Sequence, residues 1–321
     1  MANANYISKV AIVGAGGNSG KFMTEALLKT GRHTVTAITR VDSKSQLPQG
    51  VQVKKVDYSK TETLVEALKG QDALVITMNR VAGDAQTSLI NAAGEAGVPW
   101  ILPNEWSPDT ASEALVRDVA GFQAKGATRK YIADLGKSSY IAVTTGFWYE
   151  WSLAIPLAFG FDFKNKAVTL FDDGDVKISI STWPQVGRAV ATLLSLPVKS
   201  DNSTSTCLED FRNKHVYVNS FTVSQNDMLE SAMRVTGTQK KDWTITKEKS
   251  TERYQAGAEQ MKTGDHIGFV KMMYTRVFYP DGVGDFERNR GTINSALDLP
   301  TEDIDKATEA AIERSKNPWG A

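Results

Sequence analysis

The sequence has little of several residue types that mark particular classes of protein. Its 321 residues include one cysteine, Cys207, so an internal disulfide is excluded and a reducing, cytoplasmic location is expected. Lysine plus arginine equals aspartate plus glutamate at 37 each, which argues against nucleic acid as a partner. The three histidines are scattered, and no spacing of histidine, cysteine or carboxylate residues indicates a metal site.

Long apolar runs are also missing. No stretch approaches the length of about 18 residues that a membrane span needs, so no membrane partner is expected. The opening residues, MANANYISKV, lack the basic and apolar regions of a secretory signal. With 41% hydrophobic residues, the chain is nevertheless able to bury a sizeable core. These features favour a globular protein that works with a small molecule.

The first half of the chain contains a regular alternation of strand-like and helix-like segments. Strands are predicted at residues 9–16, 33–40, 51–58, 72–78, 98–106 and 139–146, and helices at 20–31, 61–70, 87–97 and 121–136. Such alternation is typical of a mostly parallel sheet with helices on both faces. We therefore predict an α/β fold with a Rossmann-type, doubly wound parallel sheet.

The regularity weakens after Gly146. Residues 167–182 have the pattern of a hairpin that turns at Asp173 and Gly174. A further strand is predicted at 215–220, and helices at 184–196, 224–237, 267–278 and 301–316. We predict an NAD(P)-binding Rossmann domain over residues 1–150 and a smaller α+β substrate-binding region over 151–321, part of which returns to the Rossmann core.

Several glycines lie close together in VAIVGAGGNSGKF, residues 10–22. The spacing Gly14-x-x-Gly17-x-x-Gly20 falls between a predicted strand and a predicted helix. There it allows a sharp turn, a close approach of the backbone to a phosphate, and close packing of the helix on the strand. The helix N-terminus adds free N–H groups and a positive dipole. The spacing predicts a nucleotide site, and a glycine turn without a ligand is the alternative.

The residues after the second strand favour NADPH as the cofactor. That strand ends at Arg40, with Lys44 close by, where an NAD site usually has an acidic residue. The planar guanidinium suits the 2′-phosphate of NADP. Asp42 keeps NAD open as an alternative, and an ordinary solvated arginine is another. The candidate cofactor-binding residues are Gly14, Gly17, Asn18, Ser19, Gly20, Arg40, Lys44, Met78, Asn79, Pro103 and Asn104.

Several segments together resemble the isoflavone reductase-like and NmrA-like branch of the atypical short-chain dehydrogenases/reductases. The resemblance covers roughly residues 9–237 and implies a reductase that uses NADPH on aromatic or polyketide-like small molecules. The segments that carry it are the glycine motif, Arg40, VDYSK (56–60), ILPNEWSPD (101–109), FQAKGATRKYI (122–132) and VGRAVATLL (186–194).

The same resemblance implies that Lys125 is the catalytic acid or base. No tyrosine in the sequence stands four residues before a lysine, so the tyrosine mechanism of the better-known short-chain dehydrogenases is excluded. A lysine that exchanges protons near neutral pH needs a lowered pKa. A cationic nicotinamide and a closed apolar pocket would both lower it. A solvated surface lysine is the simpler alternative.

Aromatic residues gather where a substrate is expected. The segment TGFWYEW, residues 145–151, follows the sixth strand at the carboxyl edge of the sheet, although packing between domains explains it equally well. Trp106 and the following Ser107 and Pro108 depart from the family pattern, so the family's substrates cannot be carried over. Glu105 is interpreted as a proton-relay partner or as a helix-capping carboxylate. The candidate substrate contacts are Glu105, Trp106, Phe147, Trp148, Tyr149, His266 and Met272.

Two other function classes stay open beside the reductase. An NmrA-type regulator would sense NADP and act through a protein partner, but such a sensor has no need of Lys125. An isomerase or aldolase-like enzyme on the same scaffold has no residue that supports it. Both a monomer and a homodimer are compatible with the sequence.

Overall fold

A seven-stranded parallel sheet forms the centre of the protein. The computed structural model describes residues 5–78, 84–200 and 206–318. The strands lie in the order β10-β6-β5-β4-β1-β2-β3, and each neighbouring pair is parallel. Their bounds are β1 Lys9–Val13, β2 Thr34–Arg40, β3 Gln52–Val56, β4 Ala73–Ile76, β5 Trp100–Leu102, β6 Ser139–Thr144 and β10 Lys214–Tyr217. This order confirms the predicted Rossmann-type, doubly wound sheet.

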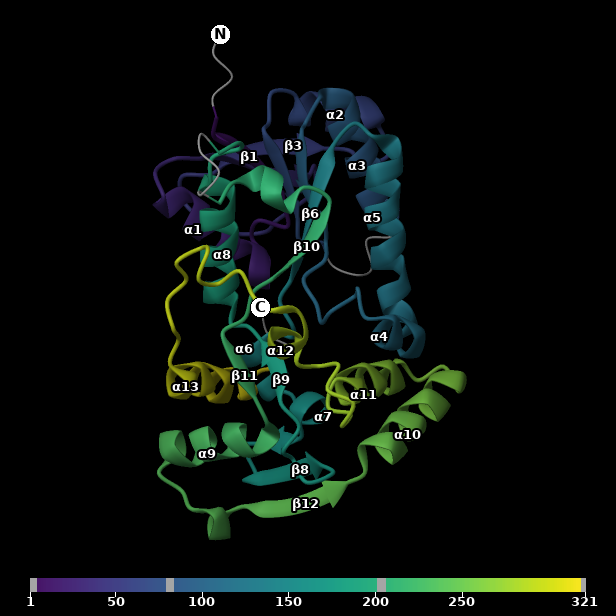
Figure 1. The fold of residues 1–321 in the computed structure, drawn as a ribbon, viewed down its shortest axis with the longest axis vertical. Coiled ribbons are helices and arrows are strands. Elements are labelled where there is room, and N and C mark those ends of the chain that lie inside the picture. Colours follow the sequence, from purple (N-terminus) through teal and green to yellow (C-terminus); the bar gives the residue numbers. More distant parts are fainter. Residues whose placement is uncertain (1–4, 79–83, 201–205, 319–321) are drawn as a thin grey trace.

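Helices cover both faces of this sheet (Figure 1). They are α1 (Asn18–Lys29) and α8 (Trp183–Ser195) on one face, and α2 (Thr61–Leu68), α3 (Ala85–Ala96) and α5 (Gln123–Leu135) on the other. Because both faces are covered, the inner strands are almost wholly apolar. The sequences ALVI in β4 and WIL in β5 are buried at every residue.

Two elements from the second half of the chain belong to this central layer. Helix α8 packs on α1 so closely that a Cβ at Gly187 would lie 2.5 Å from the Phe22 carbonyl oxygen. Strand β10 pairs with β6 at the end of the sheet. The chain therefore comes back to the Rossmann layer after residue 150, and the position of the domain boundary stays a prediction.

The remaining elements form a smaller α+β region beyond the carboxyl ends of the central strands (Figure 1). Its core is rich in phenylalanine, including the fully buried Phe159, Phe161, Phe171 and Phe278. Helix α4 (Glu113–Asp118) lies between this region and α5. The helices of the region are α6 Tyr149–Leu153, α7 Pro156–Phe159, α9 Gln225–Thr236, α10 Ser250–Lys262, α11 His266–Arg276, α12 Phe286–Arg290 and α13 Ile304–Ser315.

The predicted hairpin over residues 167–182 is wrong. Its two strands, β8 (Ala167–Phe171) and β9 (Ile178–Ile180), belong to different sheets. Strand β8 lies between β12 (Thr244–Glu248) and β7 (Phe161–Asp162), whereas β9 pairs with β11 (Phe221–Val223).

A tight turn does occur where the hairpin was expected, with Asp172 at φ 53° and Gly174 at φ 77°. This turn packs on the start of α9 instead of joining two paired strands. The Asn226 N–H donates to the Gly174 carbonyl at 3.1 Å, and the Asn226 amide donates to the Asp173 carbonyl at 3.0 Å. Both edges of β8 are already taken by other strands, so the local turn signal does not decide the pairing.

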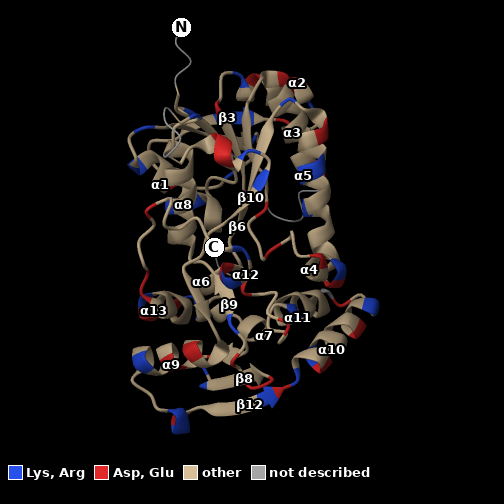
Figure 2. Ribbon diagram, in the orientation of Figure 1, with Lys and Arg blue, Asp and Glu red and all other residues tan. Residues whose placement is uncertain are grey.

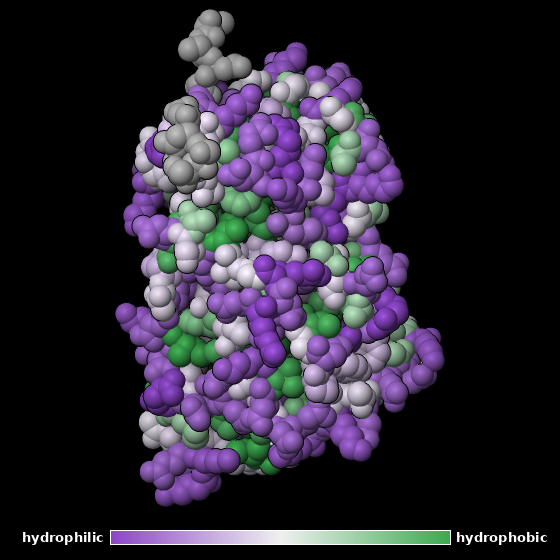
Figure 3. All heavy atoms as spheres, in the orientation of Figure 1, coloured by the Kyte–Doolittle hydropathy of each residue, from purple (hydrophilic) through white to green (hydrophobic). Residues whose placement is uncertain are grey.

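Charged side chains of both signs occur over all parts of the ribbon, as the zero net charge suggests (Figure 2). On the face shown in Figure 3, hydrophobic side chains reach the surface only in separate patches. Among the described residues, every helix is too short or too polar to cross a membrane.

Candidate active site

The glycine motif forms the turn between β1 and α1, and its three glycines have different surroundings. Gly14 has φ 83°, and a Cβ there would lie 2.2 Å from the Thr77 carbonyl oxygen. A Cβ at Gly20 would lie 2.1 Å from the Gly14 carbonyl oxygen, so packing requires glycine at both positions. At Gly17, which is exposed, a Cβ would meet only the Gly14 oxygen, at 3.2 Å. Gly17 thus faces open space in front of the helix.

A cavity of about 700 Å³ opens beside this turn. Gly17 is the N-cap of α1 and offers no side chain to the free N–H groups of the first helical turn. Arg40, at the end of β2, lines the same cavity together with Ser43 and Ser45. A helix N-terminus and an arginine at one cavity suit the phosphates of a dinucleotide.

Two exposed residues among the predicted cofactor residues do not line this cavity, and a third residue is not described. Asn18 and Lys44 are exposed, and neither is among the residues that line this cavity. Asn79 lies outside the described residues. The Arg40 Nε lies 3.8 Å from Asp42 Oδ1, but both side chains are largely exposed, so this attraction is weak and leaves the guanidinium available.

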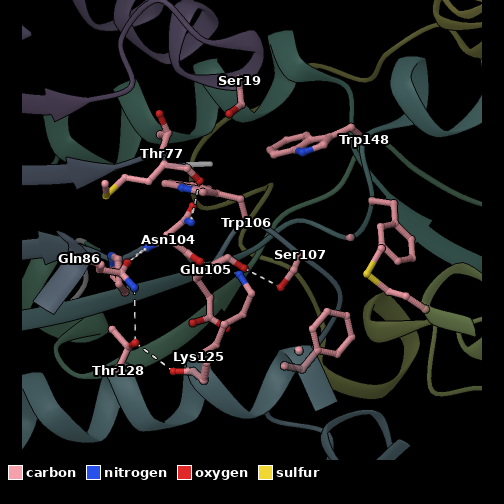
Figure 4. Close-up of a pocket in the computed structure, with 18 of the residues that line it drawn as sticks. Ser19, Thr77, Gln86, Asn104, Glu105, Trp106, Ser107, Lys125, Thr128 and Trp148 are labelled. Atoms are coloured by element: carbon pink, nitrogen blue, oxygen red, sulfur yellow. Dashed lines mark hydrogen bonds between the residues drawn. The ribbon is translucent and has the colours of Figure 1, made fainter. Parts of the chain in front are cut away.

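A second cavity, of about 480 Å³, adjoins the first at Thr77 and Met78, which line both. It lies at the carboxyl ends of β4, β5 and β6, against the smaller region (Figure 4). Lys125 is the only cationic residue among the described residues that line it. Ser19, Pro103 and Asn104 line it as well. Its aromatic and methionine residues are Met78, Trp106, Phe122, Phe147, Trp148, Trp151, Phe269, Met273 and Tyr274.

Lys125 reaches this cavity from the first turn of α5. Its Nζ donates to the Asn104 carbonyl oxygen at 2.6 Å, and the side chain is half-buried. Burial lowers the pKa of Lys125 to about 8; the Arg129 charge acts in the same direction and the Glu105 charge opposes it. An ammonium with this pKa can give up a proton near neutral pH, which a solvated lysine cannot do.

The segment after β5 presents the Asn104 carbonyl to Lys125 and is held by hydrogen bonds (Figure 4). The Asn104 N–H donates to Gln86 Oε1 at 2.9 Å, and the Asn104 amide donates to the Met78 carbonyl at 2.9 Å. The Trp106 indole N–H donates to the Ile76 carbonyl at 2.8 Å. These bonds connect α3 and the ends of β4 and β5. They fix the Asn104 carbonyl oxygen, which accepts the hydrogen bond from Lys125 Nζ.

Glu105 is 1% exposed and forms an ion pair beneath this segment. Its Oε1 lies 2.8 Å from Nη1 of Arg129, and Thr110 also donates to it. The expectation of a helix-capping carboxylate is wrong, because the hydroxyl of Ser112 caps the nearby α4. Arg129 was not predicted as a site residue, although it stands four residues after Lys125 and shares its helix face.

The candidate substrate residues divide into two groups. Phe147 and Trp148 line the cavity with Trp106 and Glu105, and their contact with a substrate stays a prediction. Tyr149 does not line it: the ring is fully buried, and its hydroxyl bonds the Thr308 hydroxyl at 2.8 Å. The side chain of His266 lies outside the described part of the structure.

Three residues of α11 line the cavity, and the predicted Met272 is not among them. Met272 packs against α10, since a Cβ at Gly257 of that helix would lie 3.3 Å from the Met272 Cβ. Phe269, Met273 and Tyr274 line the cavity instead. The spacing of four between Phe269 and Met273 is the sequence signal that places those two on one helix face.

No group of three or more histidine, cysteine, aspartate or glutamate side chains within the described ranges could hold a metal ion.

Comparisons with known proteins agree with this geometry. Residues 7–194 match the NmrA-like family. The chain is 30% identical over 312 residues to the oxidoreductase aprR of Aspergillus flavus, covering 95% of this chain and 99% of that protein. It is 30% identical over 194 residues to quinone oxidoreductase 2 of Escherichia coli, covering 58% and 64% of the two chains. A solved structure described as AtPrR2 with NADP+ and (+)pinoresinol has the same fold, with a TM-score of 0.75, 20% identity, and coverage of 94% and 98%.

Proposed function

The chain belongs to the NmrA-like family, and we propose that it is an NADPH-dependent reductase that transfers a hydride to a hydrophobic, aromatic small molecule. The enzyme class and the cofactor predicted from the sequence are confirmed: similar proteins are named oxidoreductases, and similar structures hold NADP+ or NADPH. The proposed part is the acceptor, which offers a carbonyl, an imine or a conjugated double bond.

One observation carries this proposal. Lys125 has a lowered pKa and lies in an aromatic cavity that adjoins a second cavity at the glycine motif. A proton donor and a nucleotide site are thereby brought next to a space that suits an apolar ring. A protein that only senses NADP has no use for such a donor.

The residues around the larger cavity fit NADPH. The open space at Gly17 and the uncapped start of α1 would receive the pyrophosphate, and Arg40 the 2′-phosphate. Met78 lines both cavities, and Pro103 and Asn104 line the aromatic one, so the nicotinamide end would lie among these three residues. NADPH supplies the hydride when it is bound; the remaining steps belong to the chain itself.

The chain's own task is to hold the acceptor and to deliver a proton. Aromatic walls exclude water and orient a flat ring by stacking. The Lys125 ammonium then gives its proton to the atom that gains negative charge as the hydride arrives. The Asn104 carbonyl keeps Nζ directed at that place by accepting one of its hydrogen bonds.

A substrate screen tests the proposal. NADPH oxidation is measured against a panel of aromatic ketones, imines, enones, quinones and enol ethers, with NADH as the comparison cofactor. We expect turnover with at least one aromatic member. Absence of turnover across the panel, together with NADP-dependent capture of one purified protein partner, would favour the regulator and overturn the reductase.

A further inference from the structure

Three tryptophans lie together at one side of the aromatic cavity, two in its wall and one behind them. Trp148 and Trp151 line the cavity, and Trp183, at the start of α8, lies behind them. The Trp183 ring centroid lies 6.4 Å from each of the other two centroids. On its other side Trp183 stacks on Phe22 of α1 at 6.0 Å. We call Trp148, Trp151 and Trp183 the tryptophan wall.

The wall is in contact with a residue near the end of the chain. Arg314, in the last turn of α13, places its Cζ 4.4 Å from the Trp151 ring centroid and 5.0 Å from that of Trp183. One guanidinium thus lies over two rings of the wall. Such cation–π contacts gain strength when water is excluded, and Arg314 is partly buried.

A buried carboxylate completes this arrangement. Glu150, which lies between Trp148 and Trp151 in the sequence, is 6% exposed and accepts a hydrogen bond from the backbone N–H of Trp183 at 3.1 Å. Burial raises the pKa of this carboxyl, and its hydrogen bond ties α6 to the start of α8. Arg314 itself is placed by its contacts with the two rings.

Helix α13 does not depend on Arg314 to stay in place. Near its start, Arg234 of α9 donates two hydrogen bonds to Asp305, at 2.7 and 2.9 Å. Thr308 bonds both Tyr149 and Ser231 at 2.8 Å. The anchoring of the helix and the contact with the wall can thus be separated by mutation.

We propose that Arg314 is a positioning residue that fixes the orientation of Trp151 and Trp183 and thereby sets the shape of the cavity wall that an aromatic acceptor meets. It acts through these rings and does not touch the reacting atoms. The kinetic part of this inference rests on the proposed reductase function, whereas the orientation of the rings does not.

Arg314→Gln and Arg314→Lys test the proposal in the full-length chain. The near-ultraviolet circular dichroism reports how the tryptophan rings are arranged. We expect Arg314→Gln to change this spectrum and to raise the KM for an aromatic acceptor about 3–10-fold. The Kd of NADPH should stay within about twofold and kcat within about threefold, because Lys125 and the phosphate site are untouched. Arg314→Lys keeps the cation and should restore part of both the spectrum and the KM.

Two control variants distinguish a change in the cavity wall from a general loss of stability. One is at the end of α13, and the other is on the neighbouring helix α9. Lys316→Gln removes an exposed cation that pairs only with Glu313 in the described structure, and should leave both readouts unchanged. Arg234→Gln loosens the anchor of α13, and should lower the melting temperature without the KM change.

An Arg314→Gln protein with the spectrum and KM of the wild type, or one that only melts earlier in the manner of Arg234→Gln, would overturn the proposal. If no acceptor is turned over at all, the reductase function fails, and the spectra of the two Arg314 variants still decide the role of Arg314. If Arg314→Gln does not fold, the comparison of Arg314→Lys with Lys316→Gln carries the test.

Discussion

Among the described residues that line the aromatic cavity, Lys125 is the one cation, and burial lowers its pKa to about 8. If it is the proton donor, Lys125→Ala should reduce turnover by about 10²–10⁴-fold. The affinity for NADPH should fall much less, because the phosphate site lies at the other cavity. Stopped-flow or steady-state kinetics with a verified acceptor, beside fluorescence titration of NADPH, measure both quantities.

Lys130→Ala is the matched control on the same helix. That lysine is exposed and forms a surface ion pair with Asp134 at 2.7 Å, so its loss should have almost no effect on turnover. A Lys125→Ala enzyme with most of its turnover retained would refute the assignment.

Reduction should slow as the pH rises through about 8. Burial holds the pKa of Lys125 near that value, and only the protonated amine can donate. Below pH 8 the donor is charged and ready, whereas above it a growing fraction is neutral. The measurement is kcat/KM against pH from about 6 to 10 for the wild type. A flat profile in the wild type would argue against proton donation by Lys125 in the rate-limiting step.

Arg40 should make NADPH bind more tightly than NADH. A charge-assisted contact with the 2′-phosphate is worth about 1.5–3 kcal/mol, and Arg40→Ala should remove most of that preference. Lys44→Ala is the comparison variant, since Lys44 is exposed and does not line the described cavity. Both cofactors are titrated by fluorescence; equal affinities in the wild type would contradict the assignment.

In the turn between β1 and α1, one glycine is expected to matter for cofactor binding and another for folding. Gly17→Val should abolish NADPH binding, because its side chain would take the space expected for the pyrophosphate, and should leave the fold largely intact, because a Cβ there meets a single atom, the Gly14 oxygen at 3.2 Å. Gly20→Val should instead destabilise the protein, because its Cβ would collide with the Gly14 carbonyl. Calorimetric titration and thermal melts distinguish the two results. Unchanged NADPH affinity in Gly17→Val would show that the phosphates bind elsewhere.

Local patterns predicted elements well and their partners less well. The glycine motif and Arg40 could be predicted from a few neighbouring residues, whereas Lys125 was predicted from the resemblance of its helix to that of the reductases. The hairpin at Asp173 was predicted from a true turn, but the pairing of β8 depends on strands far away in the chain. Met272 was chosen in place of Met273 because one residue is a rotation of about 100° on a helix, which composition alone does not determine.

For the whole molecule, Glu150 should make stability depend on pH. Burial raises its pKa to about 7, from 4.5 in an unfolded chain. Between these values the folded state keeps a proton that the unfolded state releases, so stability falls as the pH rises from about 4.5 to 7. The difference corresponds to about 3 kcal/mol at pH 8.

Glu150→Gln removes this titration and keeps an acceptor for the backbone N–H of Trp183. The variant should match the wild type near pH 4.5 and be more stable at pH 8. Urea unfolding at both pH values measures this, and an equal difference at the two would contradict the predicted titration.

Sheet order is a property of the whole chain that periodicity does not reveal. The β10 segment was predicted as a strand, but its place beside β6 follows from tertiary packing across some 70 residues. The same holds for the tryptophan wall, whose members come from α8 and from the segment after β6 and meet Arg314 only in the folded state.

The late arrival of β10 has a consequence for synthesis of the protein. The ribosome must release more than two hundred residues before β10, Lys214–Tyr217, which completes the central sheet, can dock on β6. Until α8 emerges, the apolar face of β1 is uncovered, and until β10 docks, the edge of β6 stays unpaired, so the nascent Rossmann layer exposes hydrophobic surface and backbone. Surfaces of this kind make a growing chain prone to aggregation during synthesis.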